Sequence, residues 1–166
     1  KTPPKPWAPL PTTNVLAQWA SRPFQYSSAI NTNVAEMIIG LLADMTIPKA
    51  HETTRSSDEG NIRTVLDPTC GSGTFLAFAM EQGMFVEGCD CNIQCVKGTG
   101  ENLKKIFGEQ EVESRSHLKR FDSSRYWEGS GRTINCVVAN LPWGVNSIEY
   151  ADENARILKS IRARIS

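Results

Sequence analysis

The chain has 166 residues, a length that suits one domain and is short for two. Hydrophobic residues make up 40% and charged residues 22%, as in ordinary globular proteins, so a core of useful size can be buried. Eighteen basic residues balance eighteen acidic ones, which removes any argument from overall charge for nucleic-acid or membrane binding.

The cysteines indicate a reducing compartment. Their number is odd and most lie in apolar or strand-like stretches, which favours free thiols over a disulfide scaffold. We therefore expect an intracellular protein, cytoplasmic or nuclear. No apolar run approaches the roughly 18 residues of a membrane span, so no membrane partner is expected. The cysteines are Cys70, Cys89, Cys91, Cys95 and Cys136.

An extended segment opens the chain. Residues 1–11 hold five of the nine prolines, which disfavour a helix or an inner strand. We expect residues 1–21 to be a proline-rich linker or tail and residues 22–166 to fold. A linker would imply a further domain before it and a tail would not, and composition leaves both open. The first residue is Lys1 and no leader pattern follows, so we expect a piece of a longer protein.

A helix is predicted at residues 33–45. Asn33 stands three residues before Glu36, as at a capped helix start. The polar stretch 48–61 that follows is predicted to be a surface loop. Within the helix, apolar side chains recur at helical spacing: Val34, Met37, Ile38, Leu41, Leu42 and Met45.

Strands and helices alternate over the rest of the chain. Four short β-type runs are predicted to be strands: 63–66, 84–89, 116–121 and 133–139. Three stretches are predicted to be helices, the second weakened by Gly98 and Gly100: 74–81, 92–107 and 152–165. This alternation predicts an α/β fold, a Rossmann-like parallel sheet with right-handed crossovers and helices on both faces. The sheet is expected to stop after its fourth strand.

A polar residue closes each predicted strand. Asp67, Asp90, Asp122 and Asn140 follow strands one to four in turn. Ligands of open α/β sheets bind at the carboxyl ends of the strands, so we expect these four residues to share one binding edge.

The turn after the first strand is built to hold a ligand. Gly71 and Gly73 let the backbone turn sharply and let a ligand lie against it, and the following helix start offers N–H groups. The turn lacks the Gly-Lys-Ser/Thr ending of a phosphate-binding loop. Leu76 stands where a dinucleotide fingerprint needs its third glycine. Nucleoside triphosphate and NAD sites are therefore disfavoured.

The run V-L-D-P-T-C-G-S-G-T-F-L closely resembles the first motif of class I methyltransferases that use S-adenosylmethionine. It is most similar to the D-P-x-x-G-S-G-T form of enzymes that methylate exocyclic amines of nucleic-acid bases. The resemblance implies that the glycine turn holds the methionine part of the cofactor. It also implies that Asp90 accepts hydrogen bonds from the ribose hydroxyls and that Asp122 lies near the adenine amino group. The implied cofactor-binding residues are Asp67, Pro68, Thr69, Cys70, Gly71, Gly73, Thr74, Asp90, Cys91, Asp122, Ser123 and Asn140.

The fourth strand ends in a second motif. Asn140-Leu141-Pro142-Trp143 resembles the [DN]-P-P-[YFW] motif of amino methyltransferases, with Leu141 in place of the first proline. A variant with one proline followed by glycine looks like the THUMP-associated RNA guanine methyltransferases. The helix at 33–45 and the segment 22–26 before it are also similar to that family. The resemblance covers roughly residues 22 to 147.

The residue types of the second motif suit methyl transfer to an amine. An exocyclic amine is a poor nucleophile, because its lone pair is delocalised into the ring. The Asn140 side-chain carbonyl and the Leu141 backbone carbonyl can accept its two N–H groups, while Pro142 stiffens the loop. Trp143 offers a flat face to a base taken out of its stack. These four residues are the predicted catalytic set, and no general base is required.

We therefore expect an S-adenosylmethionine-dependent RNA methyltransferase acting on guanosine N2 in tRNA or rRNA, with the RNA bound through a domain missing from this chain. Alternatives are N6-adenine methylation of DNA or RNA, and glutamine methylation of protein. A binding-only cofactor or RNA-binding protein is an alternative of another class, since the family's sheet has seven strands and strand four would be an exposed edge. The isolated chain is expected to be poorly stable and inactive, and a partner subunit could complete it.

Two further patterns favour a structural interpretation. Cys89, Cys91 and Cys95 form C-x-C-x₃-C, but they straddle a strand end and a helix start with no obvious fourth ligand, so no metal site is predicted. The basic residues of the last helix could touch phosphates, although a solvated helix face is favoured.

Overall fold

The computed structural model describes residues 15–26, 29–45, 62–125, 129–141 and 147–165. The predicted loop at 48–61, the first fourteen residues of the predicted linker, Pro142 and Trp143 lie outside the described residues. The elements are α1 (Val15–Trp19), α2 (Thr32–Met45), β1 (Thr64–Asp67), α3 (Thr74–Glu81), β2 (Phe85–Asp90), α4 (Ile93–Phe107), α5 (Glu109–Arg115), β3 (Ser116–Arg120), β4 (Cys136–Val137) and α6 (Ser147–Ile165).

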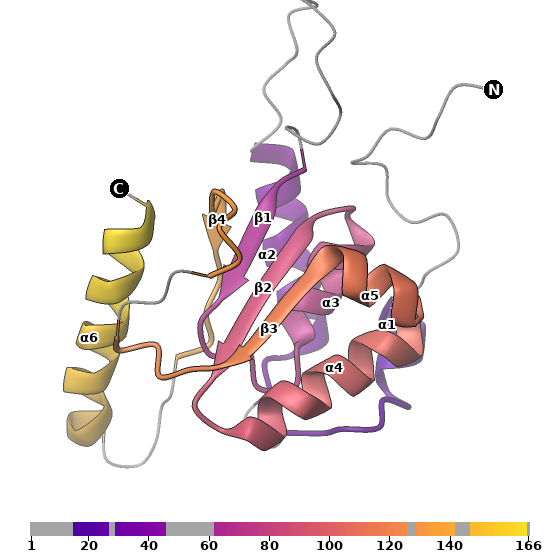
Figure 1. The fold of residues 1–166 in the computed structure, drawn as a ribbon. Coiled ribbons are helices and arrows are strands. Elements are labelled where there is room, and N and C mark those ends of the chain that lie inside the picture. The colour runs from indigo at the N-terminus through magenta and orange to yellow at the C-terminus, as the bar shows by residue number, and fades with distance from the viewer. Residues whose placement is uncertain (1–14, 27–28, 46–61, 126–128, 142–146, 166) are drawn as a thin grey trace, which may run out of the picture.

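The four described strands form one parallel sheet in the order β3-β2-β1-β4 (Figure 1). Thr64 pairs with Phe85 and Asp67 with Gly88 between β1 and β2, and Val65 pairs with Cys136 between β1 and β4. The chain winds from β1 outward through β2 to β3 and then returns to the other side of β1. The predicted α/β fold with a parallel sheet is confirmed, and the strand order reverses between β1 and β4, where such sheets bind ligands.

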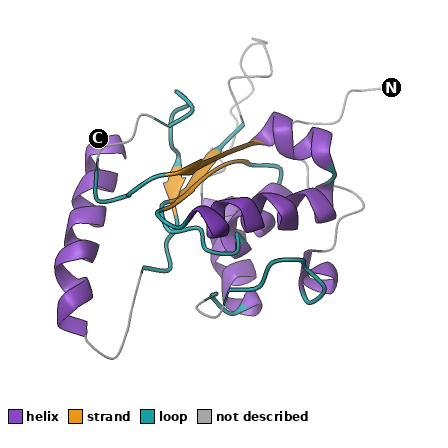
Figure 2. Cartoon of the chain, turned by 60° about the horizontal axis from the view of Figure 1, so that its bottom comes forward, coloured by secondary structure: helices purple, strands orange, loops and turns teal. Residues whose placement is uncertain are grey.

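Helices cover both faces of the sheet. Helices α2 and α3 lie on one face, and their apolar side chains form the main core with Val65 and Val86 of the sheet. On the other face Leu66 and Cys89 form a smaller cluster. Ile161 of α6 lies beside this cluster, so α6 covers the second face. Figure 2 shows α6 on one side of the strands and the other helices opposite.

The helix after the glycine turn begins and ends at glycines. Every residue from Thr74 to Met80 is buried, so α3 packs on all sides. Gly73 precedes it with φ 83°, and Gly83 follows it with φ 79°, both in the left-handed region that glycine adopts without strain. The predicted bounds of this helix are confirmed.

Helix α4 forms despite its two glycines. A Cβ atom on Gly98 would lie 2.1 Å from the ring of Phe24, so glycine here makes room for an aromatic ring. Helix propensity alone would weaken this segment, but the contact explains why glycine stands there.

The N-terminal boundary is corrected by α1. Residues 15–19 fall inside the range predicted to be linker or tail, yet Val15 and Trp19 are buried in the main core. The Val15 N–H donates to Glu81 Oε1 at 2.9 Å, which ties α1 to the end of α3. The boundary at residue 21 was therefore too late.

The structure also differs from the predictions in α2, α5 and β4. In α2, Met37 and Leu41 are exposed while Ala35 and Ile39 are buried, because apolar residues lie on most sides of this helix. The predicted fourth strand 133–139 narrows to Cys136–Val137, flanked by further backbone bonds to β1. Helix α5 was not predicted. No described helix is both long and apolar enough to cross a membrane.

Candidate functional site

A cavity of about 240 Å³ lies at the carboxyl ends of the strands. Asp67 and Asp90 end β1 and β2, Asp122 and Asn140 follow β3 and β4 by two and three residues, and all four line the cavity. Of the predicted cofactor-binding and catalytic residues, the structure brings the following to this cavity: Asp67, Pro68, Thr69, Cys70, Gly71, Thr74, Asp90, Cys91, Asp122, Ser123, Asn140 and Leu141.

One predicted cofactor-binding residue, Gly73, is not among the lining residues. Its φ of 83° starts α3, and a Cβ there would lie 2.7 Å from Thr99 Cγ2. Glycine at this position is thus explained by the turn and by the close approach of α4. Pro142 and Trp143 lie outside the described residues, so their predicted roles stay predictions.

The glycine turn leaves a helix start open to the cavity. Gly71 has φ 54°, and the Gly73 N–H donates to Cys70 O at 2.7 Å, which closes the turn. Among the described residues no side chain caps α3, and Thr74 and Phe75 of its first turn line the cavity. The first N–H groups of a helix have no intrahelical partner and carry partial positive charge, so this end can hold a carboxylate.

Asp90 connects the glycine turn to the start of α4. Its Oδ2 accepts the Gly71 N–H at 3.0 Å and its Oδ1 accepts the Asn92 N–H at 2.9 Å. Each carboxylate oxygen has two lone pairs, so both oxygens can accept a further hydrogen bond from a ligand hydroxyl. Asn92 in turn caps α4 by accepting the Gln94 N–H at 3.0 Å.

Asp67 is a buried carboxyl at the cavity wall, with 2% of its surface exposed. Its Oδ1 accepts the Thr69 N–H at 3.0 Å. Burial raises the pKa of Asp67 from 3.8 to about 7; the Thr69 hydrogen bond acts against this rise and the charge of Asp90 adds to it. The carboxyl therefore changes charge near neutral pH, and a cation bound beside it would favour the ionised form.

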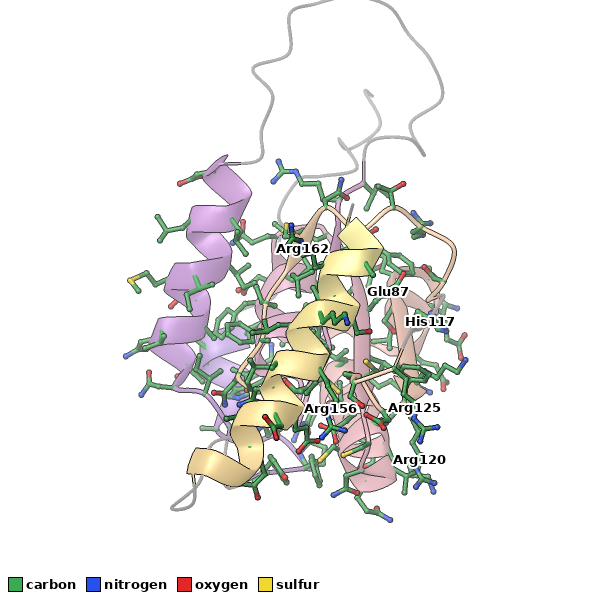
Figure 3. The ribbon with its side chains drawn as sticks, turned by 90° about the vertical axis from the view of Figure 1, so that its left-hand side faces the viewer. Glu87, His117, Arg120, Arg125, Arg156 and Arg162 are labelled. Carbon is green, nitrogen blue, oxygen red and sulfur yellow. The ribbon has the colours of Figure 1, made fainter. Side chains whose placement is uncertain are left out.

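Asp122 is an ionised and partly exposed carboxylate. Ser124 donates to its Oδ1 from both Oγ, at 2.7 Å, and N–H, at 3.0 Å. These bonds, with Arg125 and Arg156 nearby, hold the pKa of Asp122 below its ordinary value. Arg125 Nε lies 3.3 Å from Asp122 Oδ2, and Figure 3 shows Arg125 level with Arg156, which is near the middle of α6. Ser123, the residue after Asp122, donates a hydrogen bond from its hydroxyl to Pro68 O, which ties the end of β3 to the glycine turn.

The loop after β4 is tied to the same turn. Thr69 Oγ1 donates to Asn140 O at 3.3 Å, and Asn140 and Leu141 both line the cavity. Asn140, Leu141 and the glycine turn therefore lie on the same edge of the sheet, around the cavity.

Several lining residues were not predicted from sequence. Tyr26, Ala29 and Ile30 come from the segment before α2, for which the only signal was the likeness of residues 22–26 to a known family. Tyr150, Glu153 and Ile157 come from α6, where the amphipathic pattern predicted a helix but not its place beside the cavity.

The cysteines near the cavity are protonated thiols. Burial raises the pKa of Cys89 to about 12 and that of Cys95 to about 11. A thiolate is the nucleophilic form of cysteine, so these thiols are weak nucleophiles at neutral pH. In the part of the chain that the structure describes, no three His, Cys, Asp or Glu residues are grouped to hold a metal ion.

Solved structures share this fold. The glycopeptide N-methyltransferase MtfA, crystallised with S-adenosyl-L-methionine, superposes with a TM-score of 0.54 at 14% identity, over 80% of this chain and 50% of MtfA. A candidate RNA methyltransferase from Pyrococcus horikoshii gives 0.52 at 21% identity, over 81% and 56%. A human methyltransferase 10 domain containing protein gives 0.55 at 15% identity, over 81% and 60%.

These likenesses concern the fold, because the identities are low. The chain has the Rossmann-like fold of class I methyltransferases. It spans about half the length of the first two structures, 50% and 56%. No protein-family model and no curated protein matches its sequence.

Proposed function

We propose that this chain carries the cofactor-binding part of an S-adenosylmethionine-dependent methyltransferase, which transfers a methyl group to an exocyclic amine of an RNA base. Guanosine N2 in tRNA or rRNA is the acceptor that we favour. One observation carries the proposal: polar residues from all four strand ends line one cavity, and Gly71 and Asn140 lie on its walls. MtfA, which shares the fold, was crystallised with this cofactor and also with sinefungin.

The donor set fits the chemistry of the cofactor. The uncapped start of α3 suits the carboxylate of its methionine part. Asp67 suits the adjacent ammonium group, since a buried carboxyl gains most from a nearby cation. The two oxygens of Asp90 can each accept a ribose hydroxyl. Asp122 and Ser123 complete the wall where the adenine amino group needs an acceptor.

Asn140 and Leu141 are proposed to hold the acceptor amine. The side-chain carbonyl of Asn140 and the backbone carbonyl of Leu141 accept its two N–H groups and localise its lone pair. Thr69 anchors this loop by donating to Asn140 O. The bound sulfonium supplies the leaving group, so the residues chiefly align donor and acceptor for in-line displacement.

RNA is favoured over other acceptors on the sequence of the Asn140 loop and on its likeness to guanine methyltransferases. The same acceptor geometry would serve N6 of adenine in DNA or RNA, or the glutamine side chain of a protein. A protein that binds the cofactor without transferring a methyl group is the second candidate, because most residues that line the cavity are ones that suit cofactor binding.

Two measurements test the proposal. Calorimetric titration with S-adenosylmethionine should show one site, and Asp90→Ala should weaken the binding strongly. Undiminished binding by Asp90→Ala would remove the ribose assignment. Incubation of the protein with labelled cofactor and total RNA, DNA or protein then identifies the acceptor. Label in DNA or protein alone would refute the RNA proposal, and binding without any transfer would favour the binding-only protein.

A further inference from the structure

Helix α4 turns a buried polar face toward the glycine turn. Thr99 and Asn102 are both 0% exposed, and with Gly98 they lie on one side of the helix at spacings of one and three to four residues. Buried side-chain amides are costly unless they are hydrogen-bonded, so the partners of Asn102 show what this face does.

Asn102 bridges two segments that are far apart in the chain. Its Oδ1 accepts the Phe24 N–H at 2.9 Å, and its Nδ2 donates to Phe24 O at 2.8 Å. The same Nδ2 donates to Ser72 O at 2.9 Å, inside the glycine turn. Both amide donors are thereby used. We call residues 22–26 the strap; Asn102 holds the strap and the glycine turn against one another.

Gly98 and Thr99, which lie beside Asn102 on α4, contact the strap and the glycine turn as well. Gly98 lies under the ring of Phe24, where a Cβ atom would come within 2.1 Å. Thr99 Oγ1 donates to Gly71 O at 3.0 Å. One face of α4 therefore sets the position of the strap relative to the turn.

The strap carries Tyr26 to the cavity. The rings of Phe24 and Tyr26 stack with centroids 6.4 Å apart, and Tyr26 Cδ1 lies 3.4 Å from where a Cβ of Gly71 would be. Tyr26 and Asp90 both line the cavity, and the charge of Cys95, burial and the charge of Asp90 raise the pKa of the Tyr26 phenol. Tyr26 is 39% exposed, so burial alone does not hold its ring in place. Its position depends on the strap and on a side-chain hydrogen bond with Cys95 of α4.

We propose that Asn102 is a positioning residue that fixes the strap so that Tyr26 forms the wall of the cofactor cavity over Gly71. The inference rests on the proposed cofactor site, and Tyr26 becomes a cofactor-contacting residue that the sequence motifs do not include. Asn102 and Gly98 do not line the cavity, so any effect on cofactor affinity must pass through the strap or the turn.

Two glycines of α4 provide a matched test. Gly98→Ala adds a methyl group against the Phe24 ring and displaces the strap, whereas the Cβ of Gly100→Ala would meet only Leu118 Cδ1 at 3.7 Å, an ordinary contact. Both changes replace a helical glycine by alanine, so both favour the helix to a similar extent in propensity. We expect Gly98→Ala to weaken S-adenosylmethionine binding by about tenfold and Gly100→Ala by less than about twofold, measured by calorimetry.

A double-mutant cycle isolates the route through Tyr26. Asn102→Asp removes both donated bonds and places oxygen against Phe24 O and Ser72 O; we expect an affinity loss of about tenfold, similar to that of Tyr26→Ala. If Asn102 acts by placing Tyr26, the double variant should bind as weakly as Tyr26→Ala and no more weakly. Tyr26→Phe keeps the ring and should keep most of the affinity.

Hydrogen exchange gives an independent readout. The Phe24 amide should exchange faster in Asn102→Ala, which removes its acceptor Asn102 Oδ1, and stay protected in Tyr26→Ala. Additive losses in the cycle, or equal effects of the two glycine variants, would overturn the inference while leaving the cofactor site intact. Absence of cofactor binding by the unaltered chain would overturn the proposed function and this inference together.

Discussion

Replacing Asp67 by asparagine should stabilise the protein at neutral and alkaline pH while weakening cofactor binding. The carboxyl is 2% exposed, and burial raises its pKa from 3.8 to about 7. Asparagine keeps the shape and keeps an oxygen for the Thr69 N–H, but it carries no charge at any pH.

The size of the effect follows from the two pKa values. An acid whose pKa is higher in the folded than in the unfolded state binds its proton more tightly when folded, so stability falls as the pH rises from 3.8 to about 7. The difference between these values corresponds to about 4 kcal/mol at 25 °C above pH 7. Because Asp67 lies at the wall of a cavity open to solvent, about 4 kcal/mol is the upper bound for Asp67→Asn.

Urea unfolding of both proteins at pH 4, 6 and 8 measures this difference. The variant should match the unaltered protein near pH 4 and gain stability progressively toward pH 8. Cofactor affinity of the unaltered protein should rise over the same range as Asp67 ionises, and the variant should lose this pH dependence. A stability difference that does not vary with pH, or a variant that is less stable at pH 8, would refute the reasoning.

Three further substitutions test other parts of the site. Asp122→Asn should show the opposite pH dependence. Folding lowers the pKa of Asp122, so the carboxylate stabilises the folded protein above its unfolded-state pKa, and this stabilisation is lost as the pH falls through its folded-state pKa. The same urea series would show the variant to be less stable at high pH and equally stable at low pH. Gly73→Ala should destabilise by about 2–5 kcal/mol, because φ is 83° and the new methyl group would meet Thr99, and its thermal midpoint should fall; an unchanged midpoint would contradict the requirement for glycine in the turn. Asn140→Ala should lower kcat by roughly 100-fold with a much smaller change in cofactor Kd; a loss confined to cofactor binding would contradict its role as amine acceptor.

Local sequence patterns were sufficient to predict the sheet and the residues at its carboxyl edge that line the cavity. The run from Val65 to Leu76 contains its own strand, glycine turn and helix, and the polar residue after each strand was visible without any structure. In a parallel sheet all carboxyl ends meet at one edge, so the convergence of Asp67, Asp90 and Asp122 followed from the alternation of strands and helices alone.

The tertiary structure decided the features that depend on contacts between distant segments. Phe24 and Asn102 are 78 residues apart, and no local signal pairs them. Helix α2 has apolar residues on most of its sides, so only packing determined that Ile39 is buried and Met37 exposed. The raised pKa of Asp67 likewise depends on burial among neighbouring elements. The sequence by itself determined the order of the elements and the chemistry at their ends, because both are local properties. The wall of the cavity, the position of the strap and the charge state of Asp67 depended on three-dimensional packing, because burial and long-range hydrogen bonds exist only once the chain has folded.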